Sequence, residues 1–148
     1  MAATDAMRTM PWIRWLDLDT ELGDDGHVRS SLRRPKAEHL NHNGHVNAAV
    51  AYGVAEVAGA GAVVLAAGAA GTGAYTVIKS GTIDYRRPAV GGITAHAALD
   101  DEAATSITSA LGEGRGCDVD VEVALDDAAG NPTGRCTFVV SMRPPRPA

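Results

Sequence analysis

The sequence predicts an α+β domain in which an antiparallel sheet of about five to six strands wraps around one long central helix. Two patterns carry this prediction. Residues 46–66 hold a single formal charge, Glu56, and their valines recur at helical spacing. Residues 117–126 alternate between apolar and mostly acidic side chains, which is typical of a half-buried strand. A helix with so little charge needs apolar cover on most sides, and a curved sheet provides it.

The elements follow one another along 148 residues, a length that fits one domain. The expected strands are 12–22, 27–34, 74–88, 91–100, 117–126 and 135–143, the first two forming a hairpin. The expected helices are 46–66 and 101–114, the second capped by Asp100. We therefore expect one domain over 1–148, with a core at about 12–143, a flexible N-terminus at 1–10 and a proline-rich tail at 144–148.

The composition limits the classes of partner. The chain is 45% hydrophobic and has a net charge of −5, which argues against a nucleic-acid surface and against binding to anionic lipid. The least charged run, 57–70, is too short and too rich in Gly and Ala to predict a membrane span. No secretory signal is recognisable at the start, so a cytoplasmic location is expected.

The two cysteines are expected to be free. If 117–126 and 133–142 form a hairpin, Cys117 faces a position near Met142 and Cys136 one near Val123. The two sulfur atoms are then several residues out of register, which is too far for a disulfide. Both are interpreted as small core side chains, not as nucleophiles.

Glu56 is the first candidate functional residue. It shares a helical stripe with Ala49, Gly53 and Ala60, which are small enough to allow close approach by a ligand or another backbone. A glutamate on a helix is most often a solvated surface charge. A solvated face normally carries several charges, however, and this helix carries one. The pattern therefore favours a carboxylate that acts as a general base or as a nucleophile on an acyl carbon.

The start of the same helix is the second candidate. The backbone N–H groups of a helix N-terminus favour an anion, or an oxygen that becomes anionic in a transition state. The segment leading into the helix, "NHNGHVN", holds three side chains that can donate, accept or cap, and a glycine that leaves room for a ligand. The candidate binding residues here are Asn41, Asn43, Gly44, His45, Asn47 and Ala49.

Two further patterns have competing interpretations. His39, His42 and His45 recur every three residues, as zinc ligands can, but no partnering carboxylate or thiolate stands out nearby, so no metal is expected. Arg86 and Arg87, in "YRRP", suit phosphate groups or equally well surface ion pairs. The sequence has no GxGxxG, Walker-type, GxSxG or CxxC motif.

The stretch "LNHNGHVNAAVAYGVAEVAGAGAV" followed by "YTVIKSGTIDYRRPAVGGITAHAAL" resembles the hotdog-fold thioesterases of the PaaI-like type. It is most similar to their branch related to the C-terminal domain of YiiD. The resemblance covers about residues 12–143. It implies a hotdog fold and hydrolysis of an acyl-coenzyme A or a related acyl thioester. It also implies a homodimer, possibly a tetramer, with sites at the dimer interface and no cofactor apart from the CoA of the substrate.

The resemblance also implies roles for particular residues. Glu56 matches the helix carboxylate that serves as base or nucleophile, and Asn41 matches the side chain that positions water or the thioester. The backbone N–H of Ala48 matches the oxyanion donor. Arg86 and Arg87 lie where a strand end meets the ligand across the interface.

The chain departs from the family pattern at two points. Many relatives have His-Gly-Gly where this chain has Asn47-Ala48-Ala49, and many have Asp in place of Glu56. Two alternatives to a thioesterase therefore stay open. One is a protein that binds acyl thioesters without cleaving them. The other is an enoyl-thioester hydratase on the same fold, in which His42 or His45 would pair with the carboxylate.

Overall fold

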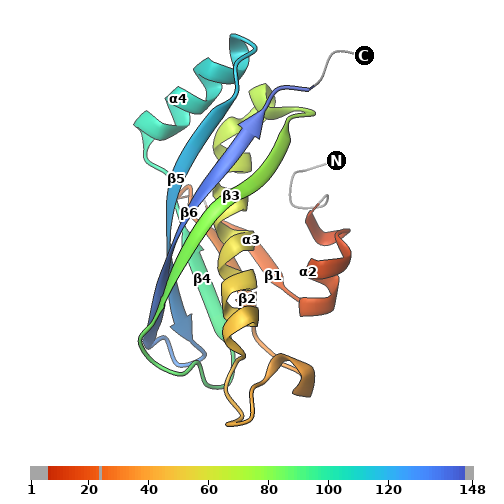
Figure 1. Cartoon of the computed structure of the whole chain (residues 1–148), viewed down its shortest axis with the longest axis vertical. Coiled ribbons are helices and arrows are strands. Elements are labelled where there is room, and N and C mark those ends of the chain that lie inside the picture. Colours follow the sequence, from red (N-terminus) through yellow and green to blue (C-terminus); the bar gives the residue numbers. More distant parts are fainter. Residues whose placement is uncertain (1–6, 24, 146–148) are drawn as a thin grey trace.

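The computed structural model describes residues 7–23 and 25–145 and has the expected α+β architecture (Figure 1). The strands are β1 (Asp19–Leu22), β2 (Val28–Leu32), β3 (Tyr75–Tyr85), β4 (Ile93–Ala97), β5 (Cys117–Asp127) and β6 (Pro132–Arg143). The helices are α2 (Pro11–Leu16), α3 (Ala48–Ala67) and α4 (Asp101–Gly112), with short 3-10 turns η1 (Ala37–His39) and η2 (Gly68–Gly71). All six strands form one antiparallel sheet in the order β1-β2-β4-β5-β6-β3.

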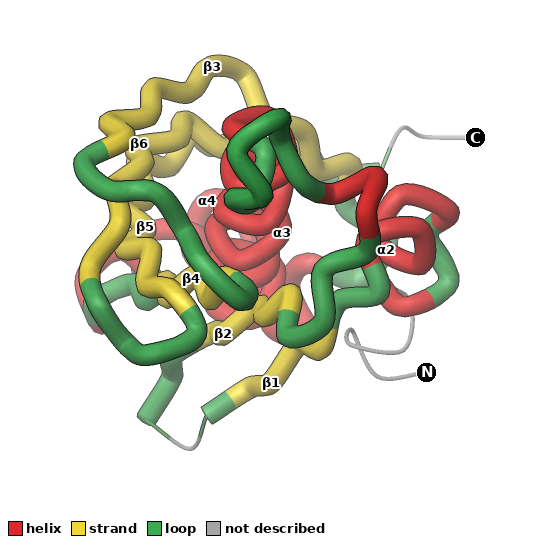
Figure 2. The backbone as a smooth tube through the Cα atoms, turned by 90° about the horizontal axis from the view of Figure 1, so that it is seen from below, coloured by secondary structure: helices red, strands yellow, loops and turns green. Residues whose placement is uncertain are grey.

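The sheet curves around α3, and α2 lies on the side of α3 that the sheet leaves open (Figure 2). Three valines of the predicted stripe, Val50, Val54 and Val57, are buried against the sheet. By length and composition the span Ala48–Gly71 could cross a bilayer, with a mean hydropathy of 1.7 in its most apolar window. Burial of 61% of that window within the fold is typical of a core helix of a folded domain.

The predicted first strand, 12–22, is wrong in its first half. Residues Pro11–Leu16 form a helix, and only Asp19–Leu22 pair with β2. Pro11 occupies the first helical turn, where its missing N–H costs nothing. The two buried side chains of α2, Ile13 and Leu16, stand three residues apart, which is helical spacing. The expected alternation is real only from Leu16 onward, through the buried Leu18 and Thr20.

The C-terminal elements follow the sequence prediction closely. The side chain of Asp100 accepts a hydrogen bond from the Ala103 N–H, 2.7 Å away, and so caps α4 as expected. In the β5–β6 pair, Cys117 faces Met142 and Cys136 faces Val123. Both thiols are free. Burial raises the pKa of the Cys136 thiol to about 11, so this thiol is protonated at neutral pH.

β3 is an edge strand that runs along α3 and exposes most of its length. Its pairing with β6 shifts register between Ile78 and Ser80, two residues before the predicted bulge at Gly81. Gly81 has a different role, because a Cβ there would overlap the hydroxyl group of Tyr52 on α3. The glycine thus lets the edge strand lie close to the helix.

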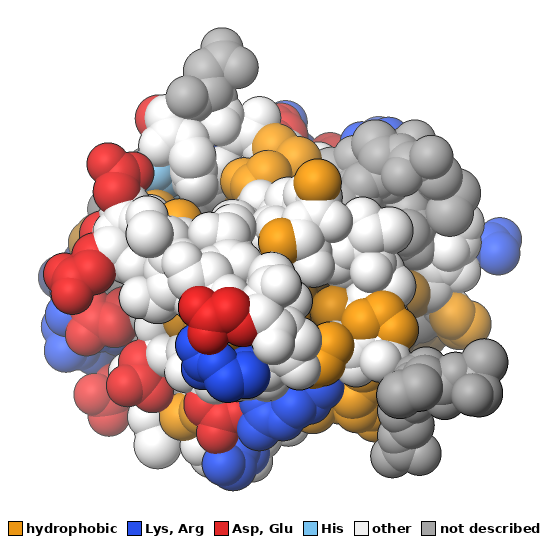
Figure 3. Space-filling model, turned by 90° about the horizontal axis from the view of Figure 1, so that it is seen from above, with side chains coloured by type: hydrophobic (Ala, Val, Ile, Leu, Met, Phe, Trp, Pro, Cys, Tyr) orange, Lys and Arg blue, Asp and Glu red, His pale blue; other side chains and the backbone are white. Residues whose placement is uncertain are grey.

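Charged side chains of both signs are interspersed on the face seen in Figure 3, which looks onto the α4 end of the molecule. One such group ties three strands together on the outer face of the sheet. Asp118 of β5 accepts from Lys79 of β3 at 2.7 Å and from Arg143 of β6 at 2.9 Å. The hydrogen bond from Lys79 is the largest cause that lowers the pKa of the Asp118 carboxyl group.

Candidate active site

The segment before α3 is a tight turn organised by Asn41. Its side-chain oxygen accepts hydrogen bonds from the backbone N–H groups of Asn43 (2.9 Å) and His45 (3.1 Å). Gly44 has a φ of 74°, the left-handed region that favours glycine. Because these bonds occupy the Asn41 oxygen, its amide nitrogen is the group left to face a ligand. Asn41 therefore shapes the loop first, whatever further contact it makes.

Asn47 caps α3. Its side-chain oxygen accepts from the Ala49 N–H at 2.9 Å, so the Ala49 donor is already used. The Ala48 N–H, by contrast, has no acceptor among the residues that the structure describes. Ala48 is also exposed. The Val50 N–H also has no acceptor among the described residues, but Val50 is buried, so the Ala48 N–H is the donor at this helix start that an incoming oxygen can reach.

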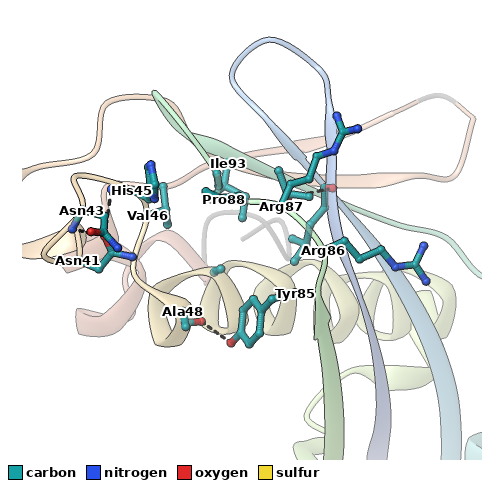
Figure 4. A pocket seen from close by; sticks show the side chains of 14 residues that line it. Asn41, Asn43, His45, Val46, Ala48, Tyr85, Arg86, Arg87, Pro88 and Ile93 are labelled. Atoms are coloured by element: carbon teal, nitrogen blue, oxygen red, sulfur yellow. Dashed lines mark hydrogen bonds between the residues drawn. The ribbon is translucent and has the colours of Figure 1, made fainter.

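The end of β3 closes over this helix start. The hydroxyl group of Tyr85 donates to the carbonyl oxygen of Ala48 at 2.7 Å (Figure 4). The backbone N–H groups of Arg86 and Arg87 both donate to the carbonyl oxygen of Thr133, which directs the chain past the helix. Sequence reasoning did not single out Tyr85, although it stands inside the "YRRP" motif.

These elements enclose a pocket of about 350 Å³ lined by both polar and apolar side chains, which we call the polar mouth after its polar residues. Its polar lining comes from Asn41, Asn43, His45, Tyr85, Arg86 and Arg87, together with the first turn of α3. The guanidinium groups of Arg86 and Arg87 extend away from the asparagines, on the opposite side of the mouth (Figure 4). Neither lies within ion-pair distance of a carboxylate in the described part of the chain, which leaves two exposed positive charges at the rim.

Glu56 does not line the polar mouth. It is half-buried two helical turns further along α3 and lines a separate, mostly apolar cavity of about 200 Å³. This cavity, the apolar cleft, lies between the N-terminal segment with α2, the α3 stripe Glu56, Ala60 and Val64, and the β3 residues 76–78. Burial raises the pKa of the Glu56 carboxyl group above its usual value, because the charged form loses hydration.

The predicted site residues are thus divided into two groups. Glu56 follows Ala48 by eight residues, which is about 12 Å along the helix axis. A base and an oxyanion donor must both come within about 3 Å of one thioester group. The Ala48 N–H and the Glu56 carboxylate of one chain therefore cannot act on the same carbonyl.

The histidines have unequal surroundings. The His39 ring is fully buried, with Nδ1 accepting from the Lys36 N–H at 3.1 Å. Its Nε2 lies 3.2 Å from the Trp15 carbonyl oxygen, to which it donates when Nδ1 accepts. Both ring nitrogens are therefore engaged by backbone groups, and His39 links α2 to the loop before α3. His42 is exposed.

Two residues near Glu56 are not predicted by the sequence analysis. Tyr52 stands one turn before Glu56 on the same face of α3, and the pKa of its phenol is raised by burial first and by the Glu56 charge second. The four-residue spacing was a signal that could have found it. Trp12 of α2 lies against Gly53, and nothing local in the sequence pointed to that contact.

The model of a family described as a domain of unknown function, DUF4442, matches residues 6–142, nearly the whole chain. The chain belongs to the DUF4442 family. Among curated proteins, none matches its sequence significantly.

Similarity to solved structures shows that this DUF4442 chain has the hotdog fold. It is similar to a proposed thioesterase from Shewanella oneidensis, with 21% identity and a TM-score of 0.79 over 95% of this chain and 94% of that chain. A probable thioesterase from Pseudomonas aeruginosa has 24% identity and a TM-score of 0.75, covering 96% of each chain. The PaaI protein of Escherichia coli, from a phenylacetic acid degradation operon, has 16% identity and a TM-score of 0.69, covering 95% and 89%. At these identities the likeness establishes the fold.

Proposed function

We propose that this DUF4442 protein is an acyl-CoA thioesterase in which Glu56 acts on a thioester held at the N-terminal end of a neighbouring copy's α3. The observation that carries the proposal is the position of Glu56. It is the only carboxylate on α3, it is half-buried in an apolar cleft, and burial raises its pKa. A general base with a raised pKa is a stronger proton acceptor near neutral pH.

The separation of Ala48 and Glu56 on one helix supports a site made by two copies of the chain. If two α3 helices lie antiparallel about a two-fold axis, each Ala48 comes beside the other copy's Glu56 when the axis passes near residue 52, halfway between them. Tyr52 lies over Gly81 of β3, so the same axis would pass the middle of that strand. The proposed assembly is therefore a homodimer joined along β3.

β3 has the features that such an assembly needs. It is an 11-residue edge strand whose outer backbone groups have no partner strand in the described sheet. Its apolar side chains Tyr75, Val77 and Tyr85 are exposed. Pairing of two β3 strands would cover them and extend the sheet across both copies.

The proposed reaction is the attack of water on the thioester carbonyl carbon. The Glu56 carboxylate takes a proton from the water as the C–O bond forms, and the carbonyl oxygen becomes an oxyanion that accepts from the second copy's Ala48 N–H. The C–S bond then breaks, and the departing thiolate receives the proton. In the variant, Glu56 itself attacks and forms an anhydride that water hydrolyses.

Coenzyme A is the proposed carrier, because its phosphates suit the two exposed guanidinium groups at the rim of the polar mouth. No cofactor enters the proposed reaction. Within the PaaI-like group we propose kinship with the branch of the YiiD C-terminal domain. Its supports are the Asn-His-x-Gly turn before α3 and an Ala-Glu pair, Ala55 and Glu56, inside that helix.

The test is thiol release from a panel of acyl-CoAs by the wild-type protein, Glu56→Gln and the control Glu122→Gln. Glu122 is an exposed carboxylate on β5, away from both pockets, so its variant should match the wild type. Glu56→Gln should lose about 100-fold to 10,000-fold in rate, the size of a general-base contribution. Equal rates in both variants would remove Glu56 from the mechanism. Binding of acyl-CoA by the wild type with no thiol release would identify an acyl-thioester-binding protein instead.

A further inference from the structure

The apolar cleft has a shape that the proposed hydrolysis does not itself require. Its lining follows α3 from Glu56 past Ala60 to Val64, eight residues or about 12 Å along the helix axis. Apart from Glu56 and Thr76, every residue that lines it is apolar. An apolar space that begins at a carboxylate and follows the helix for about 12 Å suits an extended hydrocarbon chain better than a polar group.

One end of the cleft is bounded by an aromatic wall. The Trp12 indole lies against Gly53, where a Cβ would come within 2.8 Å of its Cζ2 atom. Gly53 precedes Glu56 by one helical turn, so the absence of a side chain there brings the indole beside the Glu56 end of the cleft. Trp12 is 46% exposed, so its ring packs on the helix and yet stays open to a ligand.

Ring contacts with Trp15, and through it with His39, fix the position of Trp12. The Trp12 ring stacks on Trp15, with centroids 5.3 Å apart and an interplanar angle of 14°. Trp15 in turn meets the edge of the buried His39 ring at a centroid distance of 4.7 Å. His39 also bonds to the Trp15 carbonyl oxygen, so the pair is braced through α2 to the loop that starts α3. Two exposed indoles fixed in this way form a preorganised contact surface.

We infer that the apolar cleft binds the straight aliphatic acyl group of the thioester, with the first carbons beside Trp12 and the chain running along Ala60 toward Val64. The inference rests on the proposed function, because it places the thioester carbon at Glu56. It names the substrate class as unbranched aliphatic acyl thioesters. Ala60 is then the residue that determines how far the chain can extend, since it lies between Glu56 and Val64 on the same stripe.

The chain carries its own reporter for this inference. Its two tryptophans are Trp12, which forms the wall, and Trp15, which stacks behind it. All tryptophan fluorescence therefore comes from this region. S-alkyl-CoA thioethers of increasing length are suitable probes, because a thioether cannot be hydrolysed. Binding can then be measured whether or not the protein is a thioesterase, with free CoA as the reference ligand.

The expected result is a fluorescence change on titration with alkyl-CoA but not with CoA. The Kd should tighten by up to about fourfold per added methylene until the cleft is filled. Ala60→Leu should move that limit to shorter chains and Val64→Ala to longer ones. The control Val90→Ala, an exposed side chain outside the cleft, should leave it unchanged.

Three results would overturn the inference. The first is the same Kd for CoA and for every alkyl-CoA. The second is a length limit that neither Ala60→Leu nor Val64→Ala moves. The third is tryptophan fluorescence that responds to protein dilution but not to alkyl length, which would mean that a second copy of the chain fills the cleft. A length-dependent Kd without thiol release from true thioesters would keep the cleft assignment and remove only the proposed hydrolysis.

Discussion

The polar mouth and the apolar cleft are built on the same helix, two turns apart, and they differ in almost every property. The mouth combines apolar side chains with amides, arginines and the Ala48 N–H, which has no acceptor among the described residues, and a loop turn with a strand end positions it. The cleft is lined by aliphatic and aromatic side chains around one carboxylate with a raised pKa. In the proposed reaction, each region supplies one half of the groups that thioester hydrolysis needs.

One helix can line two pockets and still keep the donor in one pocket too far from the carboxylate in the other for both to act on one group. A helix separates residues by 1.5 Å each, so the backbone positions of a donor and a base eight residues apart lie about 12 Å apart along the axis. Close approach of another chain is the simplest way to bring a mouth and a cleft together. The small side chains of the exposed Ala49 and the half-buried Ala60 leave space for such an approach, whereas Gly53 is already covered by Trp12.

The variant with the greatest expected loss of activity alters the polar mouth and leaves the fold intact. Ala48→Pro removes the proposed oxyanion donor and puts the proline ring in its place without breaking a hydrogen bond of the helix, because Ala48 is the first residue of α3 and its N–H has no acceptor in the described part of the chain. Asn47 already has an extended backbone, with φ −60° and ψ 141°, as a residue before proline requires. Thiol release should fall about 100-fold to 1,000-fold with the melting temperature nearly unchanged. Full activity in the folded variant would show that this N–H is not the donor.

Mixing the same variant with Glu56→Gln tests whether one active site takes its groups from two copies of the chain. If each site takes Ala48 from one copy and Glu56 from the other, a mixed dimer has one intact site. Random exchange of equal amounts then restores about a quarter of the wild-type rate from two inactive proteins. No recovery after proven exchange of subunits would place both groups of each site on one chain.

A smaller effect is expected from Tyr85→Phe. The change removes the hydrogen bond to the Ala48 carbonyl oxygen and should cost about 1 kcal/mol in the free energy of unfolding, measured by urea denaturation. Thiol release should fall a few-fold as the mouth loosens, whereas the binding of alkyl-CoA thioethers should keep the same dependence on chain length. A changed length limit would mean that the two regions are not independent.

The smallest effect concerns stability and pH at the cleft. The pKa of Glu56 is raised by burial, so between the ordinary value of 4.5 and the folded value the folded protein binds more protons than the unfolded chain. The free energy of unfolding therefore falls as the pH rises through that window. Glu56→Gln should be slightly more stable than the wild type at neutral pH, and the gain should shrink as the pH falls through that window and be lost below pH 4.5. A variant less stable at neutral pH would show that the carboxylate stabilises the fold.

Local sequence patterns were sufficient to predict the position of several helices and strands. The central helix was predicted at 46–66 and spans Ala48–Ala67, because its cap, Asn47, and its end, Gly68, are encoded within the segment itself. The β5–β6 register, including the positions opposite both cysteines, followed from alternation and one turn. The N-terminal segment was misread because a strand pattern from Leu16 to Thr20 was extended backward over a helix that begins at Pro11.

The fold class, the long apolar helix and the two chemical groups at its start and its middle follow from local sequence patterns. The residues that surround each group become visible only in the folded chain. Trp12 reaches Gly53, and Tyr85 reaches Ala48, across about 40 residues of chain. Periodicity and capping are set by neighbours within a few residues, so they can be read directly. Contacts between distant segments depend on how the whole sheet curves around the helix, and no local pattern encodes that curvature.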